Sequence, residues 1–275
     1  MQGLDLLSSG RSAAPDGFDA ADPPVLLRLL GGFRLTMGAQ TLPIRSGGKT
    51  EALLVHLGLA GSRGVSRHAL LQAIWPHSEA ALAGKALNTL VHELKGLLST
   101  ALRGASPVLS AAGQYRLNEA AGVAVDVAQF RSMLARGQLL EGQRRATEAA
   151  ALYERAVELY GGDLTPVGSG AQIVLEREVL RAAYRRVLIR LADAAFARDE
   201  FDKCLVYATA LLVDDPCRED AHRVVMRCHV RLGERSQAVR HYLAVRQILN
   251  IELGVEPEPT TQALFEQIRV NPAEV

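Results

Sequence analysis

A residue pattern that recurs at a fixed spacing near the end of the chain limits the folds open to it more than any other feature. The stretch Asp199-Glu-Phe-Asp-Lys-Cys has the same pattern as Gly233-Glu-Arg-Ser-Gln-Ala, which begins 34 positions later. Between the two copies, Asp215-Pro216 falls where the turn between paired helices is expected. The spacing predicts a stack of helix pairs, although any antiparallel array of helices can produce such a period by accident.

The chain from residue 126 onward has the periodicity of helices throughout. Because 34 residues is the period of tetratricopeptide-like helix pairs, this part is expected to be an all-α helical-repeat domain. Such repeats stack into a curved scaffold with a concave groove that suits a peptide or another protein. Helices are predicted over about residues 126–141, 143–160, 172–198, 201–213, 219–232, 235–251 and 260–269.

The part of the chain before these helices mixes short apolar runs with three helical patterns. Strands are predicted at 25–30, 33–37 and 41–44, and helices at about 49–60, 68–75 and 81–100. Two extended runs on either side of Gly113 predict a hairpin after the third helix. Strands, three helices and a hairpin in this order describe a winged helix-turn-helix, which is an α+β unit.

The domain organisation follows from these patterns. We expect a mainly α protein with a flexible polar tail at residues 1–24, a winged-helix DNA-binding domain at 25–120 and a tetratricopeptide-like domain at 121–275. The formal charge is −3 over residues 1–24, +7 over 25–118 and −3 over 119–275. A basic front module on a mildly acidic remainder is typical of a nucleic-acid reader with a protein-facing domain, although chance variation between domains gives the same division.

Several classes of protein are made improbable by what the chain lacks. The first 24 residues have no cationic start followed by an apolar run, and no run of about 18 apolar residues follows, so neither a secretory signal nor a membrane span is expected. The cysteines Cys204, Cys217 and Cys228 are odd in number and lack a CxxC spacing. We therefore expect a cytoplasmic protein without disulfides, metal or cofactor and without a membrane partner.

Nine short motifs occur in an order that matches a known family. They are Leu29-Leu-Gly-Gly-Phe-Arg-Leu, Gly48-Lys-Thr-Glu-Ala-Leu-Leu, Leu70-Leu-Gln-Ala-Ile-Trp-Pro, Lys85-Ala-Leu-Asn-Thr-Leu-Val-His-Glu-Leu, Gly113-Gln-Tyr-Arg-Leu, Asp126-Val-Ala-Gln-Phe, Tyr160-Gly-Gly-Asp-Leu, Asp215-Pro-Cys-Arg-Glu-Asp-Ala-His and Glu252-Leu-Gly-Val-Glu-Pro. With these motifs the chain resembles the Streptomyces antibiotic regulatory protein family in its short form. Members have an OmpR-type winged helix followed by a bacterial transcriptional activator domain.

The resemblance implies a function and a set of partners. It implies a transcription activator that binds direct repeats in promoter DNA as a homodimer and contacts RNA polymerase and its sigma factor. In that family the helical domain supports activation and self-association. No enzymatic activity is expected, since no Ser/His/Asp or paired-carboxylate pattern is present. Gly47-Gly48-Lys49-Thr50 lacks the preceding glycine of a phosphate-binding loop.

Specific side chains are predicted to contact DNA. On the third helix the polar face, opposite an arc of apolar residues, comprises Lys85, Asn88, Thr89, His92 and Lys95. Further contacts are predicted at the start of helix one, at the start of helix two and in the wing. They are Lys49, Thr50, Arg67, His68, Ser110, Gln114 and Arg116. Tyr115 and Trp75 are expected in the core.

Two alternative functions stay open. A protein-protein adaptor with a degenerate winged helix is favoured by Gly84, Glu93 and Gly96, which are unusual in a helix that reads DNA. A ligand-sensing regulator, whose helical domain binds a small molecule or a signalling nucleotide, is favoured by the arginines of the long helix. Of these, the predicted ligand contacts are Arg181, Arg185 and Arg186. A solvated helix face explains the same arginines.

Overall fold

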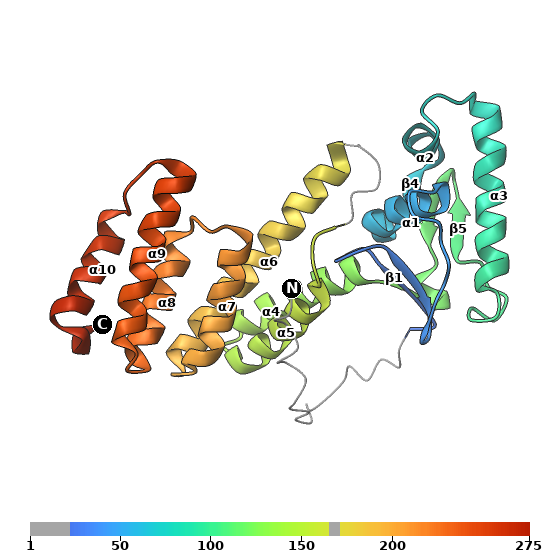
Figure 1. Ribbon diagram of the computed structural model, residues 1–275. Helices are drawn as coiled ribbons and strands as arrows, with labels where there is room; N and C mark the ends of the chain where they lie inside the picture. The colour runs from blue at the N-terminus through green and yellow to red at the C-terminus, as the bar shows by residue number, and fades with distance from the viewer. Residues whose placement is uncertain (1–22, 165–170) are drawn as a thin grey trace.

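The computed structural model describes residues 23–164 and 171–275. An α+β unit lies at one end of the molecule, and a stack of helices leads from it to the opposite end (Figure 1). The predicted mainly α fold, with a winged helix before a helical-repeat domain, is confirmed. The predicted tail at 1–24 lies, up to residue 22, outside the described residues. No helix in the described ranges is both long and apolar enough to cross a bilayer.

The α+β unit contains two small sheets in its described residues. Their strand orders are β3-β2-β1-β7, with β7 parallel to β1, and β4-β6-β5. The strands are β1 (Val25–Arg28), β2 (Arg34–Met37), β3 (Gln40–Thr41), β4 (Val65–Ser66), β5 (Val108–Ala111), β6 (Gln114–Leu117) and β7 (Val123–Val125). The helices are α1 (Lys49–Ala60), α2 (Arg67–Ile74) and α3 (Ala80–Leu98), with short 3-10 turns η2 (Gly61–Arg63) and η3 (Glu119–Ala121).

The strands of the first sheet are amphipathic. In β1, Val25 and Leu27 are buried while Leu26 and Arg28 alternate onto the outer face.

The predicted third strand at 41–44 was wrong in its bounds, since β3 ends at Thr41. Pro43 has no amide hydrogen to continue a ladder, which explains the early end. The strand β7 was not predicted. It lies after the proposed domain boundary at 120, although it pairs with β1 of the front sheet. The division of the chain at residue 120 stays a prediction.

The helical part contains α4 (Asp126–Gly142), α5 (Ala146–Tyr160), α6 (Ala171–Ala197), α7 (Phe201–Asp214), α8 (Glu219–Arg231), α9 (Arg235–Leu253) and α10 (Pro259–Val270), followed by the 3-10 turn η4 (Pro272–Glu274). Each helix packs on the next one along the chain. The helices α7 and α9 start 34 residues apart, so the predicted repeat is confirmed.

The turns that join the helices reuse one backbone conformation. Asp199 and Gly233, which occupy equivalent places in the two repeats, have φ of 58° and 78°. Arg144, between α4 and α5, has φ of 61° and belongs to a turn with the same hydrogen-bond pattern. Only glycine adopts this left-handed region at little cost. The repeat therefore has a third turn of the same form, which the sequence pattern did not show.

The α+β unit and the helical stack share a buried polar contact. Asp126, the first residue of α4, is 1% exposed, and its Oδ2 accepts the amide hydrogens of Leu29 and Leu30 at 2.8 and 2.9 Å. Its Oδ1 accepts the amide hydrogen of Val127 at 2.7 Å. Burial raises the pKa of Asp126, and the three amide donors oppose that shift. One carboxyl group thus fastens the chain after β1 to the start of the helical stack.

Two glycine motifs meet beside this carboxylate. The amide of Gly31 donates to the carbonyl oxygens of Gly162 and Asp163 at 3.0 and 3.1 Å. A Cβ at Gly31 would lie 2.7 Å from the carbonyl oxygen of Gly161, and Gly31 also has φ of +70°. No other residue type permits this approach of two backbones without a shift. One apolar cluster then continues from Val25 across the contact to helix α6.

The turn conformation predicts opposite effects of two glycine replacements. Gly233→Ala forces an alanine into the left-handed region and should lower the free energy of unfolding by about 1 kcal/mol. Gly142→Ala should raise it by about 0.5–1 kcal/mol, because Gly142 ends helix α4 with open space at its Cβ position. Urea denaturation measures both. Equal effects of the two replacements would contradict the assignment of the turns.

The buried carboxylate predicts a large loss of stability when it is removed. Asp126→Ala leaves three amide hydrogens without their acceptor and should lower the free energy of unfolding by about 3 kcal/mol or more. Asp202→Ala, at an exposed position in the first turn of α7, is the matched control and should cost about 1 kcal/mol or less. Urea unfolding monitored by circular dichroism gives both values. Similar losses for the two variants would show that Asp126 does not fasten the junction.

Candidate nucleic-acid interface

The helices α2 and α3 form the helix-turn-helix of the front unit. The hydroxyl of Ser66 accepts the amide hydrogen of Ala69 at 3.2 Å, so Ser66 caps α2. The helix ends at Ile74, two residues before Pro76. The longer α3 then runs along the outer edge of the unit, at the opposite end of the molecule from α10 (Figure 1).

The two faces of α3 differ as predicted. Leu87, Leu94 and Leu98 are buried at 1% exposure or less, although Leu97, which was expected on the same side, is 41% exposed. The predicted DNA contacts Lys85, Asn88, Thr89, His92 and Lys95 are all exposed. The hydroxyl of Thr89 donates to the carbonyl of Lys85 at 3.1 Å. The structure therefore brings these five side chains together on one solvent-facing surface.

Arg67 connects the helix-turn-helix to the wing, which sequence reasoning did not foresee. Its Nη1 donates to the hydroxyl of Tyr115 at 3.3 Å. Its Nη2 would lie 2.4 Å from a Cβ at Gly84, so the guanidinium passes directly over α3 at that glycine. In the sequence, Gly84 is only an unusual residue for a helix that reads DNA. Its small size explains how α2, α3 and the wing approach one another; nothing in the structure explains Gly96.

The predicted contacts at the start of helix one have a structural role as well. The ammonium of Lys49 donates to the carbonyl of Ile74 at the end of α2 and lies 5.9 Å from the centre of the Trp75 ring. Trp75 is half-buried and packs on the core, as expected. Thr50 is half-buried, whereas His68 is exposed at the start of α2. Lys49 thus stabilises the turn before α3.

The wing is the hairpin of β5 and β6. Their register pairs Ser110 with Tyr115 and Ala111 with Gln114, which leaves Ala112-Gly113 as a two-residue turn. Both turn residues have positive φ, as a type I′ turn requires. Along β6 the side chains alternate, so the wing presents polar residues on one face while Tyr115 is buried, as predicted. The three side chains of the wing that were predicted to contact DNA, Ser110, Gln114 and Arg116, are exposed.

The front unit and the helical part differ in whether their charged side chains form ion pairs. All the ion pairs recorded among the described residues join side chains at or beyond Arg131. The front unit has a formal charge of +7 between residues 25 and 118. Lys49 and Arg67 form hydrogen bonds within the unit. The cations on α3 and in the wing face solvent. This combination gives one end of the molecule a positive surface.

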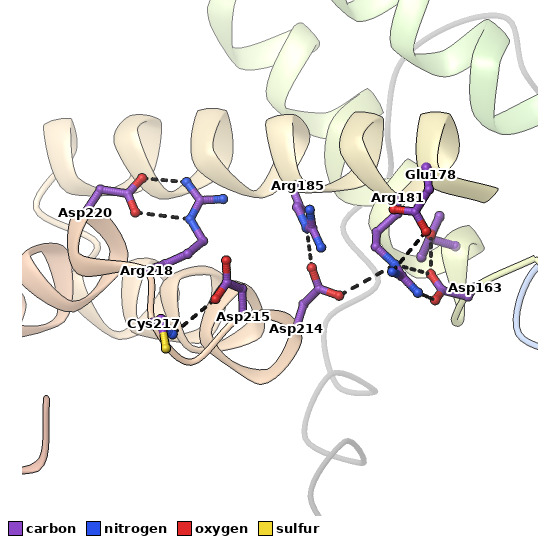
Figure 2. Close-up of polar contacts among 10 residues, drawn as sticks. Asp163, Glu178, Arg181, Arg185, Asp214, Asp215, Cys217, Arg218 and Asp220 are labelled. Atoms are coloured by element: carbon purple, nitrogen blue, oxygen red, sulfur yellow. Dashed lines mark hydrogen bonds and ion pairs between the residues drawn. The ribbon is translucent and has the colours of Figure 1, made fainter. Parts of the chain in front are cut away.

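Two of the three arginines proposed as ligand contacts, Arg181 and Arg185, lie within a polar network on α6 (Figure 2). Arg181 pairs with Asp163, Glu178 and Asp214, and its guanidinium lowers the pKa of Asp163. Arg185 pairs with the same Asp214. These contacts fasten α6 to α7 and to the chain after α5. Arg186 is exposed and forms no ion pair with any described residue.

Two histidines of α8, His222 and His229, lie beside His241 of α9. His241 on α9 shares a hydrogen bond with His222, whose Nδ1 lies 2.9 Å from the Nε2 of His241. Burial lowers the pKa of His241 to about 4. Among the described residues no group of three or more histidine, cysteine or acidic side chains has the arrangement of a metal site. These histidines therefore contribute to the packing of α8 on α9.

Comparison with known proteins places the chain among transcriptional regulators. Residues 125–269 match the model of the bacterial transcriptional activator domain. The chain is 27% identical over 248 residues to the transcriptional regulatory protein MoaR1 of Mycobacterium tuberculosis, covering 89% of this chain and 79% of that protein. It is 25% identical over 240 residues to the regulatory protein AfsR of Streptomyces coelicolor, covering 87% of this chain but only 24% of AfsR.

A solved structure has the same fold. Mycobacterium tuberculosis EmbR, determined in complex with a low affinity phosphopeptide, superposes with a TM-score of 0.70 at 22% identity. The match covers 90% of this chain and 65% of the EmbR chain. The order of helices and strands, the matched family model and the named relatives all point to the same family of regulators. The chain belongs to the Streptomyces antibiotic regulatory protein family of transcriptional regulators, with a bacterial transcriptional activator domain in its helical part.

Proposed function

We propose that this protein is a DNA-binding transcription activator that places α3 in the major groove of promoter DNA. The observation that carries the proposal is the solvent-facing surface of α3, where Lys85, Asn88, His92 and Lys95 lie side by side above an apolar back. A helix of this kind fits the width of the major groove. The positive charge of the front unit supplies the attraction to phosphate.

Each side chain of this surface has a distinct role in the proposal. Asn88 offers a donor and an acceptor to one adenine, and the methyl group of Thr89 can contact a thymine methyl, since its hydroxyl is engaged with the helix backbone. Lys85 and Lys95 neutralise phosphates on either side of the groove. The wing residues Ser110, Gln114 and Arg116 grip the backbone or the adjacent minor groove. Lys49 and Arg67 instead hold the reading helix in place.

The helical part is proposed to carry the contacts with proteins. Stacked helix pairs present a continuous surface for a partner. We propose that it supports a homodimer on direct DNA repeats and contacts RNA polymerase and its sigma factor in the cytoplasm. The names of the matched relatives, which are regulatory proteins, support regulation of transcription as the outcome.

Substitutions on α3 test the proposal. Lys85→Ala and Lys95→Ala should each weaken binding to all DNA sequences and reduce the slope of log affinity against log salt by about 1, because one phosphate contact is lost. Lys203→Ala, an exposed lysine on α7, is the matched control and should leave the slope unchanged. Fluorescence anisotropy on promoter fragments at several salt concentrations gives these slopes.

Asn88→Ala tests the reading of bases separately from phosphate contact. It should reduce the discrimination between the promoter site and a site with one altered adenine by about 1–3 kcal/mol, while the salt slope stays unchanged. Competition binding with the two sites measures this difference. If all three α3 variants bind DNA like the wild type, α3 is not the helix that contacts DNA and the proposed interface is wrong.

A further inference from the structure

A cleft of about 790 Å³ lies where the outer face of the first sheet meets the first two helices of the stack. Strands β1 and β7 form one wall, and α4 and α5 form the other. The cleft lies away from the proposed DNA-binding surface, since no residue of α2, α3 or the wing lines it. Its volume is within the range of about 300–1,000 Å³ that is usual for small-molecule sites.

The walls of the cleft combine apolar surface with several cations. Leu26, Met133, Leu152 and Leu159 line it and are each only half-buried, so they offer apolar area to a bound molecule. The arginines of the cleft come from three different elements, β1, α4 and α5. They are Arg28, Arg136 and Arg155, and the acidic residues of the lining are Glu119 and Glu158.

The positive charge extends beyond the cleft. A smaller hollow of about 330 Å³ on the same sheet face shares Leu26 and Arg28 with it and adds Arg34. Arg28 and Arg34 are directly opposite each other in the register of β1 and β2. Two adjacent guanidinium groups on a sheet repel each other, and an anion between them relieves this repulsion.

We propose that this cleft binds a small amphipathic anion, with its apolar body against Leu26, Met133 and Leu152 and its carboxylate among the arginines. The proposal goes beyond transcription activation, and it differs from the ligand contacts expected on α6. Arginine is suited to the head group because its fork of donors matches a carboxylate. The half-buried leucines suit an alkyl chain or a ring of the ligand, because burial of apolar surface on both sides is favourable.

The position of the cleft gives such a ligand an effect on the whole molecule. The strand β7 runs directly into Asp126, the carboxylate that fastens the two parts of the chain. A molecule bound in the cleft contacts β1, β7, α4 and α5 at once, so it adds contacts between the two parts of the chain that Asp126 already joins. Ligand binding is therefore expected to raise the thermal stability of the chain, by mass action on the folded state.

Three probes with the same ten-carbon chain test the proposal. Decanoate should raise the melting temperature saturably, decanol should do so weakly, and decyltrimethylammonium should not. Isothermal titration calorimetry of the full chain gives the affinities without any DNA, so the result is independent of the DNA-binding proposal. Equal binding of all three probes, or binding of none, would overturn the inference.

Variants locate the site. Arg28→Gln and Arg155→Gln should each weaken decanoate binding about tenfold by loss of a charge-assisted hydrogen bond and leave decanol binding unchanged. Ala128→Phe, which fills the cleft from α4, should weaken both probes. Arg227→Gln, an exposed arginine on α8, is the matched control and should change neither. Circular dichroism confirms that each variant is folded.

A last experiment distinguishes two possible occupants of the cleft, a free small anion and the acidic residues 1–22 of the chain itself. Residues 1–22 contain four aspartates and one arginine, and Pro23, which follows them, lines the cleft. A chain that lacks residues 2–22 should bind decanoate with the same affinity as the full chain. Binding that is detected only after this deletion would mean that the segment itself occupies the cleft, and the proposal of a small anion would fail.

Discussion

The carboxylate of Asp126, which accepts the backbone amides of Leu29 and Leu30 inside the core, is the contact on which the architecture depends. A buried carboxyl group is costly unless its oxygens have donors, and here three amides supply them. Beside it, Gly31 lies against Gly161 at a separation that excludes any side chain. The front unit and the helical stack are therefore joined through backbone contacts and a common apolar core, in addition to the chain between them.

The two parts that this junction joins differ in how their charges are paired. In the helical stack, arginines on one helix pair with carboxylates on another, as Arg181 and Arg185 do with Asp214 (Figure 2). In the front unit the cations of α3 and the wing have no such partners among the described residues, while Lys49 and Arg67 hold the elements together. A positive surface on a firmly attached unit suits a polyanion, and the paired charges of the stack suit internal order.

Much of this fold was predictable because local patterns determined it. The helices of the stack, the 34-residue period and the exposed face of α3 all follow from residue types at regular spacing. The contacts that bring distant residues together were not predictable. The approach of Arg67 to Gly84, the partner of His222 on α9 and the pairing of β7 with β1 depend on tertiary packing, which no short pattern encodes.

The central claim is that the exposed cations of the front unit bind the phosphates of DNA. Titration of promoter binding by the full chain against salt concentration tests it most directly. The account predicts that log affinity falls linearly with log salt concentration, because each neutralised phosphate releases counterions. An affinity that does not change with salt would contradict the account, because it would show that no phosphate is neutralised.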